Sequence, residues 1–465
     1  MSLARLTAFE EYMFRDDCPA YPMTGTFRLR FAGRVDRESF ESAVHHAVAR
    51  HPLLRATVEQ RRWRRPRWIE QPDWLPEIEW DAETNEFGCP NASFMNLTES
   101  PGTRVWMTET PRGSSAIFQV HHACTDALGM TQAFEDILIG YARRRDTNTK
   151  AELAVLAHDR FPGRGAPDLT VWRFMRMAHK QAVGLLGARQ FLFRQPAALQ
   201  ERREELDVNA APRCFPAATT FPFDIDETRA MLATAKSLGS TVNDLLARDM
   251  FLALGRWRKA NGIGTDKDWL RFAVPMNLRR EADARLPMCN SVSYVFLDRQ
   301  PREFDDETKL LESIRAEMGR IKRCELQYTS VLSLAASRML PGGLAAATPP
   351  NKCMSTCVFT NPGIVLRKTP LPRDDGRLVA GDVILDGVDY IPPLRPNTGA
   401  AICPYTYAGR LNILMHHDPR IVSNEQAASL LGMYVEQLRK SSAHAATSSS
   451  RAASEPSPLL TETST

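Results

Sequence analysis

The alternation of β-strand and α-helix patterns along the chain constrains its fold more than any other feature. In the first half, apolar and β-branched residues predict strands over 24–31, 106–110 and 115–120. Apolar residues at helical spacing predict helices over 36–51 and 128–141. Each predicted helix therefore follows a predicted strand, which is typical of an α/β layer.

The second half repeats the alternation. Predicted helices begin near Asp226, Thr241, Asp305 and Ser423, and predicted strands cover 270–274, 291–297, 353–359 and 410–415. Thr241 and Asp244 have the spacing of a capping box, which indicates a helix start. Two such halves predict an α/β fold with two layers facing one another.

The chain of 465 residues is longer than the length that one hydrophobic core ordinarily supports, which indicates two lobes. We assign 1–160 to an N-terminal lobe and 217–440 to a C-terminal lobe. The crossover, 161–216, is expected to contain a basic amphipathic helix, either a solvated linker or a helix resting on an anionic membrane surface. The tail, 441–465, is rich in Ser, Ala, Thr and Pro and is expected to be disordered.

Composition narrows the classes of function. A net charge of +4 is too small to indicate a nucleic-acid partner. No secretory signal and no apolar stretch of about 18 residues are visible. Nine scattered cysteines indicate reduced thiols, and Cys353 and Cys357 lack a second pair at zinc-ligand spacing. We expect a cytoplasmic protein that binds no metal ion. If the basic helix binds lipid, the protein is expected at the inner face of the membrane.

Adjacent histidines at the end of the 115–120 strand are the main chemical signal. His121-His122 is followed by small residues, then by Asp126 and a predicted helix. A side chain on such a turn faces a cleft, and an imidazole with an ordinary pKa near 6.5 can accept a proton at neutral pH. His122 is the candidate general base, and His121 is expected to support the turn.

Two further His-His pairs favour structural roles. His45-His46 lies within the helix over 36–51, with one member expected to face solvent. His416-His417 follows the last predicted strand and is interpreted as a polar turn.

The motif resembles the His-His-x-x-x-Asp-Gly motif of the chloramphenicol acetyltransferase-like superfamily. That superfamily includes condensation domains of nonribosomal peptide synthetases, polyketide-associated acyltransferases and bacterial wax ester synthase/diacylglycerol acyltransferases. Further matches follow in the order of the family: His51-Pro52-Leu53-Leu54-Arg55, Gly239-Ser240-Thr241-Val242-Asn243-Asp244, Val274-Pro275-Met276-Asn277-Leu278-Arg279-Arg280, Asn290-Ser291-Val292-Ser293 and Thr360-Asn361-Pro362-Gly363. They span about 1–440 and are most similar to the wax ester synthase and polyketide-associated branches.

Two positions depart from the family pattern. Ala127 replaces the usual Gly, which reduces backbone freedom at the turn, and Cys289 stands where the wax ester synthase branch often has Gly. No carrier domain is encoded beside the motifs, so we expect a stand-alone acyltransferase.

The resemblance implies two lobes, each a mixed sheet with flanking helices, and an active-site tunnel between them. It implies acyl transfer from acyl-CoA or an acyl carrier protein thioester to an alcohol or glyceride hydroxyl, with His122 as base and no bound cofactor. Two alternatives stay open: a condensation-type enzyme that forms amides from carrier-bound thioesters, and a non-catalytic binding module of the same fold.

The resemblance also implies roles for the surrounding residues. Asp126 either orients His122 or forms an ion pair with Arg279, with Arg280 as the second choice of partner. From the residues themselves, Asn277, Asn361 and Gly363 are candidates for binding the oxyanion or the substrate; the alternative is that their polar groups only satisfy the ends of strands. The basic cluster over 61–67 either contacts phosphates of coenzyme A or an acidic carrier protein, or is a solvated loop.

Overall fold

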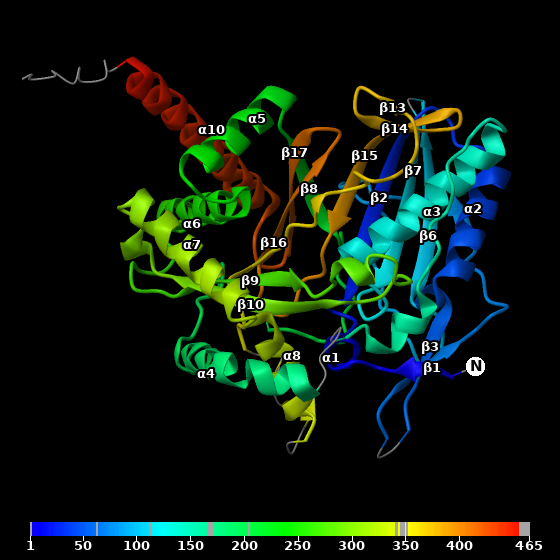
Figure 1. Cartoon of the computed structure of the whole chain (residues 1–465), viewed down its shortest axis with the longest axis horizontal. Helices are drawn as coiled ribbons and strands as arrows, with labels where there is room; N and C mark the ends of the chain where they lie inside the picture. Colours follow the sequence, from blue (N-terminus) through cyan, green and yellow to red (C-terminus); the bar gives the residue numbers. More distant parts are fainter. Residues whose placement is uncertain are drawn as a thin grey trace, which may run out of the picture.

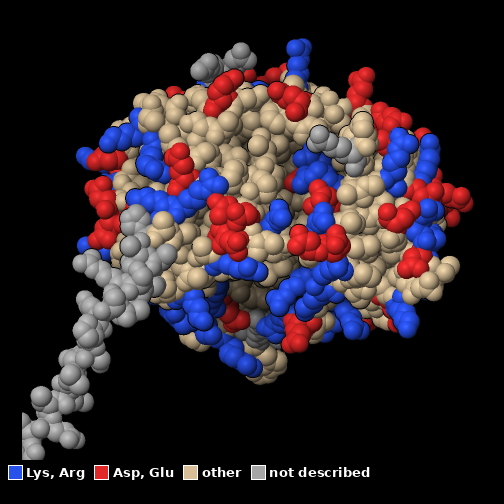
Figure 2. Space-filling model, turned by 90° about the horizontal axis from the view of Figure 1, so that it is seen from above, with Lys and Arg blue, Asp and Glu red and all other residues tan. Residues whose placement is uncertain are grey.

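The computed structural model describes residues 2–61, 64–111, 113–165, 171–202, 205–339, 343–344, 349 and 352–454. The chain forms two lobes side by side, each built on a mixed β-sheet with flanking helices, as predicted (Figure 1). No helix in the described residues is long and apolar enough to cross a membrane. Figure 2 shows cationic and anionic side chains interspersed over the face seen from above.

The N-terminal lobe contains a sheet with the strand order β13-β14-β15-β2-β7-β6-β5. Its strands are β2 (Thr24–Ala32), β5 (Ile78–Trp80), β6 (Thr103–Thr110), β7 (Gly113–His121), β13 (Arg373–Asp374), β14 (Arg377–Ala380) and β15 (Val383–Ile391). Helices α2 (Arg37–Arg50) and α3 (Ala127–Arg145) pack against each other on one face of this sheet (Figure 1). A small sheet of β1 (Ser2–Arg5), β4 (Arg67–Glu70) and β3 (Ala56–Glu59) and helix α1 (Ala8–Asp16) complete the lobe.

The C-terminal lobe contains a sheet with the order β10-β9-β11-β16-β17-β8, and β12 pairs with β16. Its strands are β8 (Ala217–Pro222), β9 (Leu270–Asn277), β10 (Val292–Arg299), β11 (Cys357–Phe359), β12 (Gly363–Ile364), β16 (Ala400–Tyr407) and β17 (Arg410–His417). Helices α5 (Ile225–Ser237), α6 (Val242–Ala260), α7 (Glu307–Arg323) and α10 (Asn424–Ser454) lie on its outer side, and α4 (Val171–Phe193) and α8 (Gln327–Ser337) lie near its lower end (Figure 1).

Strands from the second half of the chain complete the N-terminal sheet, so the predicted boundary at residue 217 does not divide the lobes in space. β15 pairs antiparallel with β2, placing Leu385 opposite Phe31 and Tyr390 opposite Phe27. The apolar residues of β15 are buried in the core of the N-terminal lobe. Hydrophobic burial thus places 373–391 in the lobe opposite to the one expected from sequence order.

The end of α10 and the start of β11 also differ from the sequence predictions. α10 continues past residue 440 to Ser454, so 441–454 is helical where a disordered tail was predicted, and 455–465 lie outside the described residues. The strand predicted over 353–359 is shorter and covers Cys357–Phe359.

Local capping determines where the helices begin. The capping box predicted at Thr241 is present, with reciprocal hydrogen bonds between Thr241 and Asp244. Ser423 and Gln426 form the same reciprocal pair at the predicted start of α10. α5 begins after Asp224 rather than at Asp226, because Asp224 and Glu227 form the capping box.

The last His-His pair lies within β17 and is buried, so the interpretation as a polar turn was wrong. His416 Nδ1 donates to the Pro392 carbonyl at 2.7 Å, and His417 Nε2 lies 3.0 Å from Asn424 Oδ1. Burial lowers the pKa of His416 to about 4, which keeps the ring neutral at pH 7.

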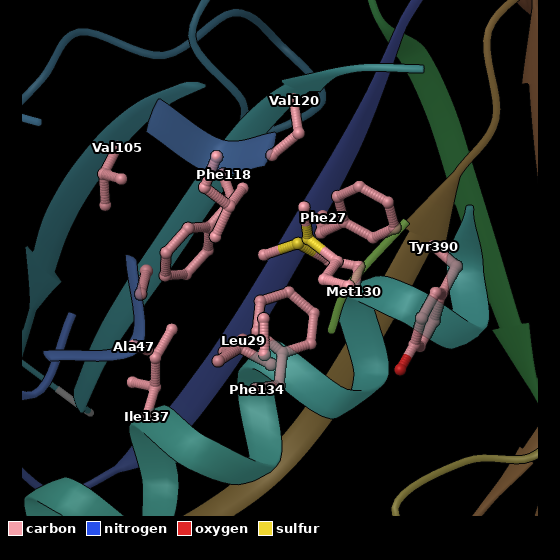
Figure 3. Packing of buried hydrophobic residues seen from close by; sticks show 14 of the residues in the cluster. Phe27, Leu29, Ala47, Val105, Phe118, Val120, Met130, Phe134, Ile137 and Tyr390 are labelled. Atoms are coloured by element: carbon pink, nitrogen blue, oxygen red, sulfur yellow. The ribbon is translucent and has the colours of Figure 1, made fainter. Parts of the chain in front are cut away.

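Aromatic packing fixes α3 on the N-terminal sheet. Phe134 of α3 packs edge-to-face against Phe27 and Phe118, with ring centroids 5.9 and 5.2 Å apart (Figure 3). Tyr390 of β15 packs on Phe27 at 5.6 Å in the same arrangement. Burying each such ring contributes about 1.5–3 kcal/mol, so these contacts hold the first turns of α3 on the sheet that carries the histidine motif.

Candidate active site

His122 lies on the turn that joins β7 to α3, as the sequence predicted. Its Nδ1 is 2.7 Å from the Thr125 carbonyl oxygen, which can only accept, so Nδ1 carries the hydrogen and Nε2 keeps its lone pair. Burial lowers the pKa of His122 below its ordinary value of 6.5. The ring is therefore neutral at pH 7 and able to accept a proton through Nε2.

A cavity between the lobes lies against this turn. It is lined from the N-terminal lobe by Gly25, Phe27, Val120, His122, Thr125, Asp126, Ala127, Leu128 and Tyr390, with Ile391, Pro392 and Pro393 following, and from the C-terminal lobe by Pro275, Asn277, Val292, Tyr294, Val358, Thr360, Asn361, Pro362 and Cys403. The lining is mostly apolar with a few polar groups, which is typical of small-molecule sites. The His122 side chain therefore faces an interlobe cavity.

Asp17, which belongs to no recognisable sequence motif, holds both histidines in place. His121 Nδ1 accepts from the Ala123 backbone N–H at 3.0 Å, so Nε2 carries the ring hydrogen and donates to Asp17 Oδ2 at 3.2 Å. Asp17 Oδ1 accepts from the Met23 N–H at 2.7 Å, and the Met23 carbonyl accepts from the His122 N–H at 2.7 Å. His121 thus supports the turn from beneath, as predicted.

Asp126 caps α3 and forms an ion pair with the opposite lobe. Its Oδ1 accepts from Gly129 N at 2.8 Å, and its Oδ2 accepts from Arg279 Nη1 at 2.6 Å and Ser291 N at 2.7 Å. Burial by itself would lower the pKa of Arg279, but the adjacent carboxylate raises it above its ordinary value. The predicted Asp126–Arg279 pair is confirmed. Direct orientation of His122 by Asp126 is not observed, because the Thr125 carbonyl occupies the ring Nδ1.

The loop over 278–291 carries these contacts from the C-terminal lobe to the turn. Asn290 Nδ2 donates to the His122 carbonyl at 2.7 Å, and Met288 N donates to His51 Nδ1 at 3.0 Å. Leu286, Met288 and Cys289 are buried in the core of the N-terminal lobe. The Asn290 motif was visible in the sequence, but its contact with the turn required the structure.

Ala127 is compatible with the turn despite replacing the usual Gly. It is the first residue of α3 and is absent from the described residues with positive φ, so no glycine conformation is required there. Ala127 is one of the residues that line the cavity.

The predicted oxyanion-binding residues differ in whether their N–H groups already donate a hydrogen bond within the protein. Asn277 lines the cavity, and its Oδ1 accepts from Arg279 N at 3.0 Å, which leaves its Nδ2 hydrogens without a described acceptor. Asn361 also lines the cavity, but its Nδ2 donates to Asn243 Oδ1 at 2.7 Å. The Gly363 N–H donates to Asn361 Oδ1 at 2.7 Å, and Gly363 is not among the lining residues. Gly363 is therefore unsuited to bind an oxyanion.

The described residues of the basic cluster, 61 and 64–67, lie between β3 and the start of β4 and are not among the residues that line the cavity. Arg61 pairs with Glu59 at 2.6 Å, and Arg62 and Trp63 lie outside the described residues. In the described residues, no three His, Cys, Asp or Glu side chains gather closely enough to hold a metal ion.

No protein-family profile matches the chain. An uncharacterized protein of Mycobacterium tuberculosis, recorded in two strains, is 22% identical over 354 residues, which make up 73% of this chain and 77% of the relative.

Solved structures resemble the whole two-lobed chain. The first condensation domain of the CDA synthetase has a TM-score of 0.65 at 15% identity, covering 94% of this chain and 95% of that domain. The starter condensation domain of rhizomide synthetase, solved with C8-CoA, has a TM-score of 0.64 at 15% identity, covering 95% of this chain and 95% of that domain. Polyketide synthase associated protein 5 from Mycobacterium tuberculosis has a TM-score of 0.61 at 15% identity, covering 95% of this chain and 99% of that protein. These likenesses confirm the predicted fold, and the wax ester synthase branch stays a prediction.

Proposed function

We propose that this chain, which has the two-lobed fold of condensation domains and of polyketide synthase associated protein 5, is an acyltransferase. In this proposal an acyl group moves from a thioester to a hydroxyl group of an alcohol or glyceride, with His122 as general base. The observation that carries the proposal is the lone pair of His122 Nε2 on a neutral ring beside an interlobe cavity.

The reaction requires one proton transfer in each direction. The acceptor oxygen attacks the thioester carbonyl carbon while its proton passes to Nε2, a step that general-base catalysis accelerates by roughly 10²–10⁴-fold. The C–S bond then breaks, and the protonated ring returns the proton to the departing thiolate. The products are an ester and a free thiol.

Donors at the cavity are available for the developing oxyanion. Asn277 Nδ2 is the side-chain candidate, because its Oδ1 is already held by the Arg279 N–H. The backbone N–H groups of Ala127 and Leu128 precede the first hydrogen bonds within α3, and both residues line the cavity. The positive end of the α3 dipole favours negative charge in the same place.

The charge of the lining favours a hydroxyl acceptor over an amine. Among the described lining residues, Asp126 is the one Asp, and none is Glu, Lys or Arg. The ion pair with Arg279 neutralises the Asp126 charge. A protonated amine would find no available carboxylate there, whereas a hydroxyl enters without a charge to desolvate. The amide-forming alternative, which the synthetase neighbours suggest, would use the same base and a carrier-bound or coenzyme A thioester.

Turnover with defined acceptors tests the proposal. The full chain is incubated with octanoyl-CoA and, in separate reactions, a long-chain alcohol, a diglyceride or a primary amine, and free thiol and acylated product are measured. Ester formation is expected, with His122→Ala slower by at least about 10²-fold. His46→Ala, which removes an exposed histidine from α2, should keep the wild-type rate.

Three results would contradict this assignment. Amide without ester would identify the condensation-type alternative. Binding of octanoyl-CoA without any product would indicate a binding module. Unchanged turnover in His122→Ala would remove this residue as the base.

A further inference from the structure

The crossover helix α4 exposes large apolar side chains on the side facing away from the protein. Trp172 is 77% exposed, Met175 59% and Phe193 77%. At about 100° per residue, these positions fall within a sector of roughly 60° around the helix axis. Trp172 and Met175 are about one turn apart and form an exposed apolar pair, which indicates an interaction surface, whereas Phe193 lies about 27 Å further along the axis.

The opposite side of α4 holds the helix on the protein. Met177 is buried in a cluster with Leu278, Tyr328 and Val331. Gln181 Oε1 accepts from the Thr329 hydroxyl at 2.7 Å. Met177 and Gln181 lie roughly 140–180° around the axis from Trp172, so α4 carries separate protein-facing and outward-facing sides.

The charge of α4 identifies the kind of surface that its outward side fits. The helix contains Arg173, Arg176, Lys180 and Arg189 and no Asp or Glu. Arg176 is exposed about 40° from Trp172 around the axis, next to the apolar side chains. A Trp and other apolar side chains flanked by cations are suited to the headgroup region of an anionic membrane, where the apolar groups enter the acyl boundary and the cations meet phosphates.

We propose that the outward side of α4, defined by Trp172, Met175 and Arg176, binds the surface of anionic membranes. Trp, Met and Arg also occur together at protein interfaces, so the salt-dependent preference for anionic over neutral vesicles is the result that separates a membrane from an acidic protein partner. The proposal is independent of the acyltransferase assignment, because none of the described α4 side chains lines the cavity.

The location of α4 connects this surface to the site. Met177 shares a buried cluster with Leu278, which lies between Asn277 at the cavity and Arg279, the partner of Asp126. A membrane bound by α4 would therefore lie against a helix that shares a buried cluster with the loop over 278–291.

Vesicle flotation with the full chain tests the proposal. Vesicles of phosphatidylcholine alone are compared with vesicles containing phosphatidylserine, at low and high salt. We expect binding to anionic vesicles that weakens with salt and with Arg176→Glu. Trp172→Ser/Met175→Ser should reduce binding at least about ten-fold. The matched control, Leu232→Ser/Leu238→Ser, removes exposed leucines at α5 and should bind as wild type.

Several outcomes would overturn the proposal. These are the absence of vesicle binding, equal binding to neutral and anionic vesicles, and equal loss in the control variant. Self-association in solution that Trp172→Ser/Met175→Ser abolishes would assign this face to a second copy of the chain. Circular dichroism of each variant establishes that lost binding does not reflect unfolding.

Discussion

At the scale of residues, the site depends on a carboxylate that the sequence did not reveal. Asp17 bonds to His121 and, through Met23, holds the backbone of His122. A lone Asp after a short helix has no spacing that distinguishes it from a surface residue. His122 and the Asp126–Arg279 pair were predictable, because recognisable motifs carry them.

Asp17→Asn should impair the site while leaving the chain folded. Both partners of Asp17 are hydrogen-bond donors, and an amide can accept with only one of its two groups. We expect kcat to fall about 10- to 100-fold with KM for the acyl thioester unchanged, since one charge-assisted hydrogen bond is lost. Steady-state kinetics and ¹⁵N spectra of the His121 tautomer check this. An unchanged kcat would contradict the positioning role.

At the scale of elements, the ion pair ties the start of α3 to the loop over 278–291. Asp126→Asn preserves a good N-cap but leaves the mostly buried Arg279 guanidinium without a counter-charge. We expect a loss of about 3–5 kcal/mol in the free energy of unfolding. Thr241→Ala, which removes only the cap of α6, should cost about 1 kcal/mol. Equal losses in denaturant titrations would show that Asp126 acts only as a cap.

Elements with local signals could be predicted, and those that depend on distant pairing could not. Capping boxes marked the starts of α6 and α10. β16 was missed because Pro404 lies inside it, opposite Ile413, and a proline argues against a central strand. β15 reads as an apolar run, but its pairing with β2 in the other lobe has no local signal.

At the scale of the whole molecule, Asp389 joins the two sheets. Its Oδ2 accepts from Arg28 Nε at 2.8 Å and from Arg30, and its Oδ1 accepts from Thr220 and Tyr405 hydroxyls at 3.1 Å each. β2 and β15 belong to the N-terminal sheet, and β8 and β16 to the C-terminal sheet. This fully buried carboxylate therefore connects both walls of the cavity.

Asp389→Asn should weaken the junction between the lobes. Removing the charge leaves Arg28 and Arg30 facing a neutral amide, and we expect about 3–5 kcal/mol of destabilisation by chemical denaturation. Asp386→Asn on the same strand breaks an exposed pair with Arg377 and should cost less than about 1 kcal/mol. A similar cost for both variants would contradict the junction.

The pH dependence of kcat tests the central claim, that neutral His122 takes the acceptor's proton, most directly. Burial lowers the pKa of His122 below 6.5, so the active neutral form is present above this lowered pKa and is lost as pH falls through it. We predict a kcat that is constant at pH 7–8 and declines below 6.5, and His122→Ala should remove both the rate and this decline. A decline centred above pH 6.5, or one that survives in His122→Ala, would contradict the account.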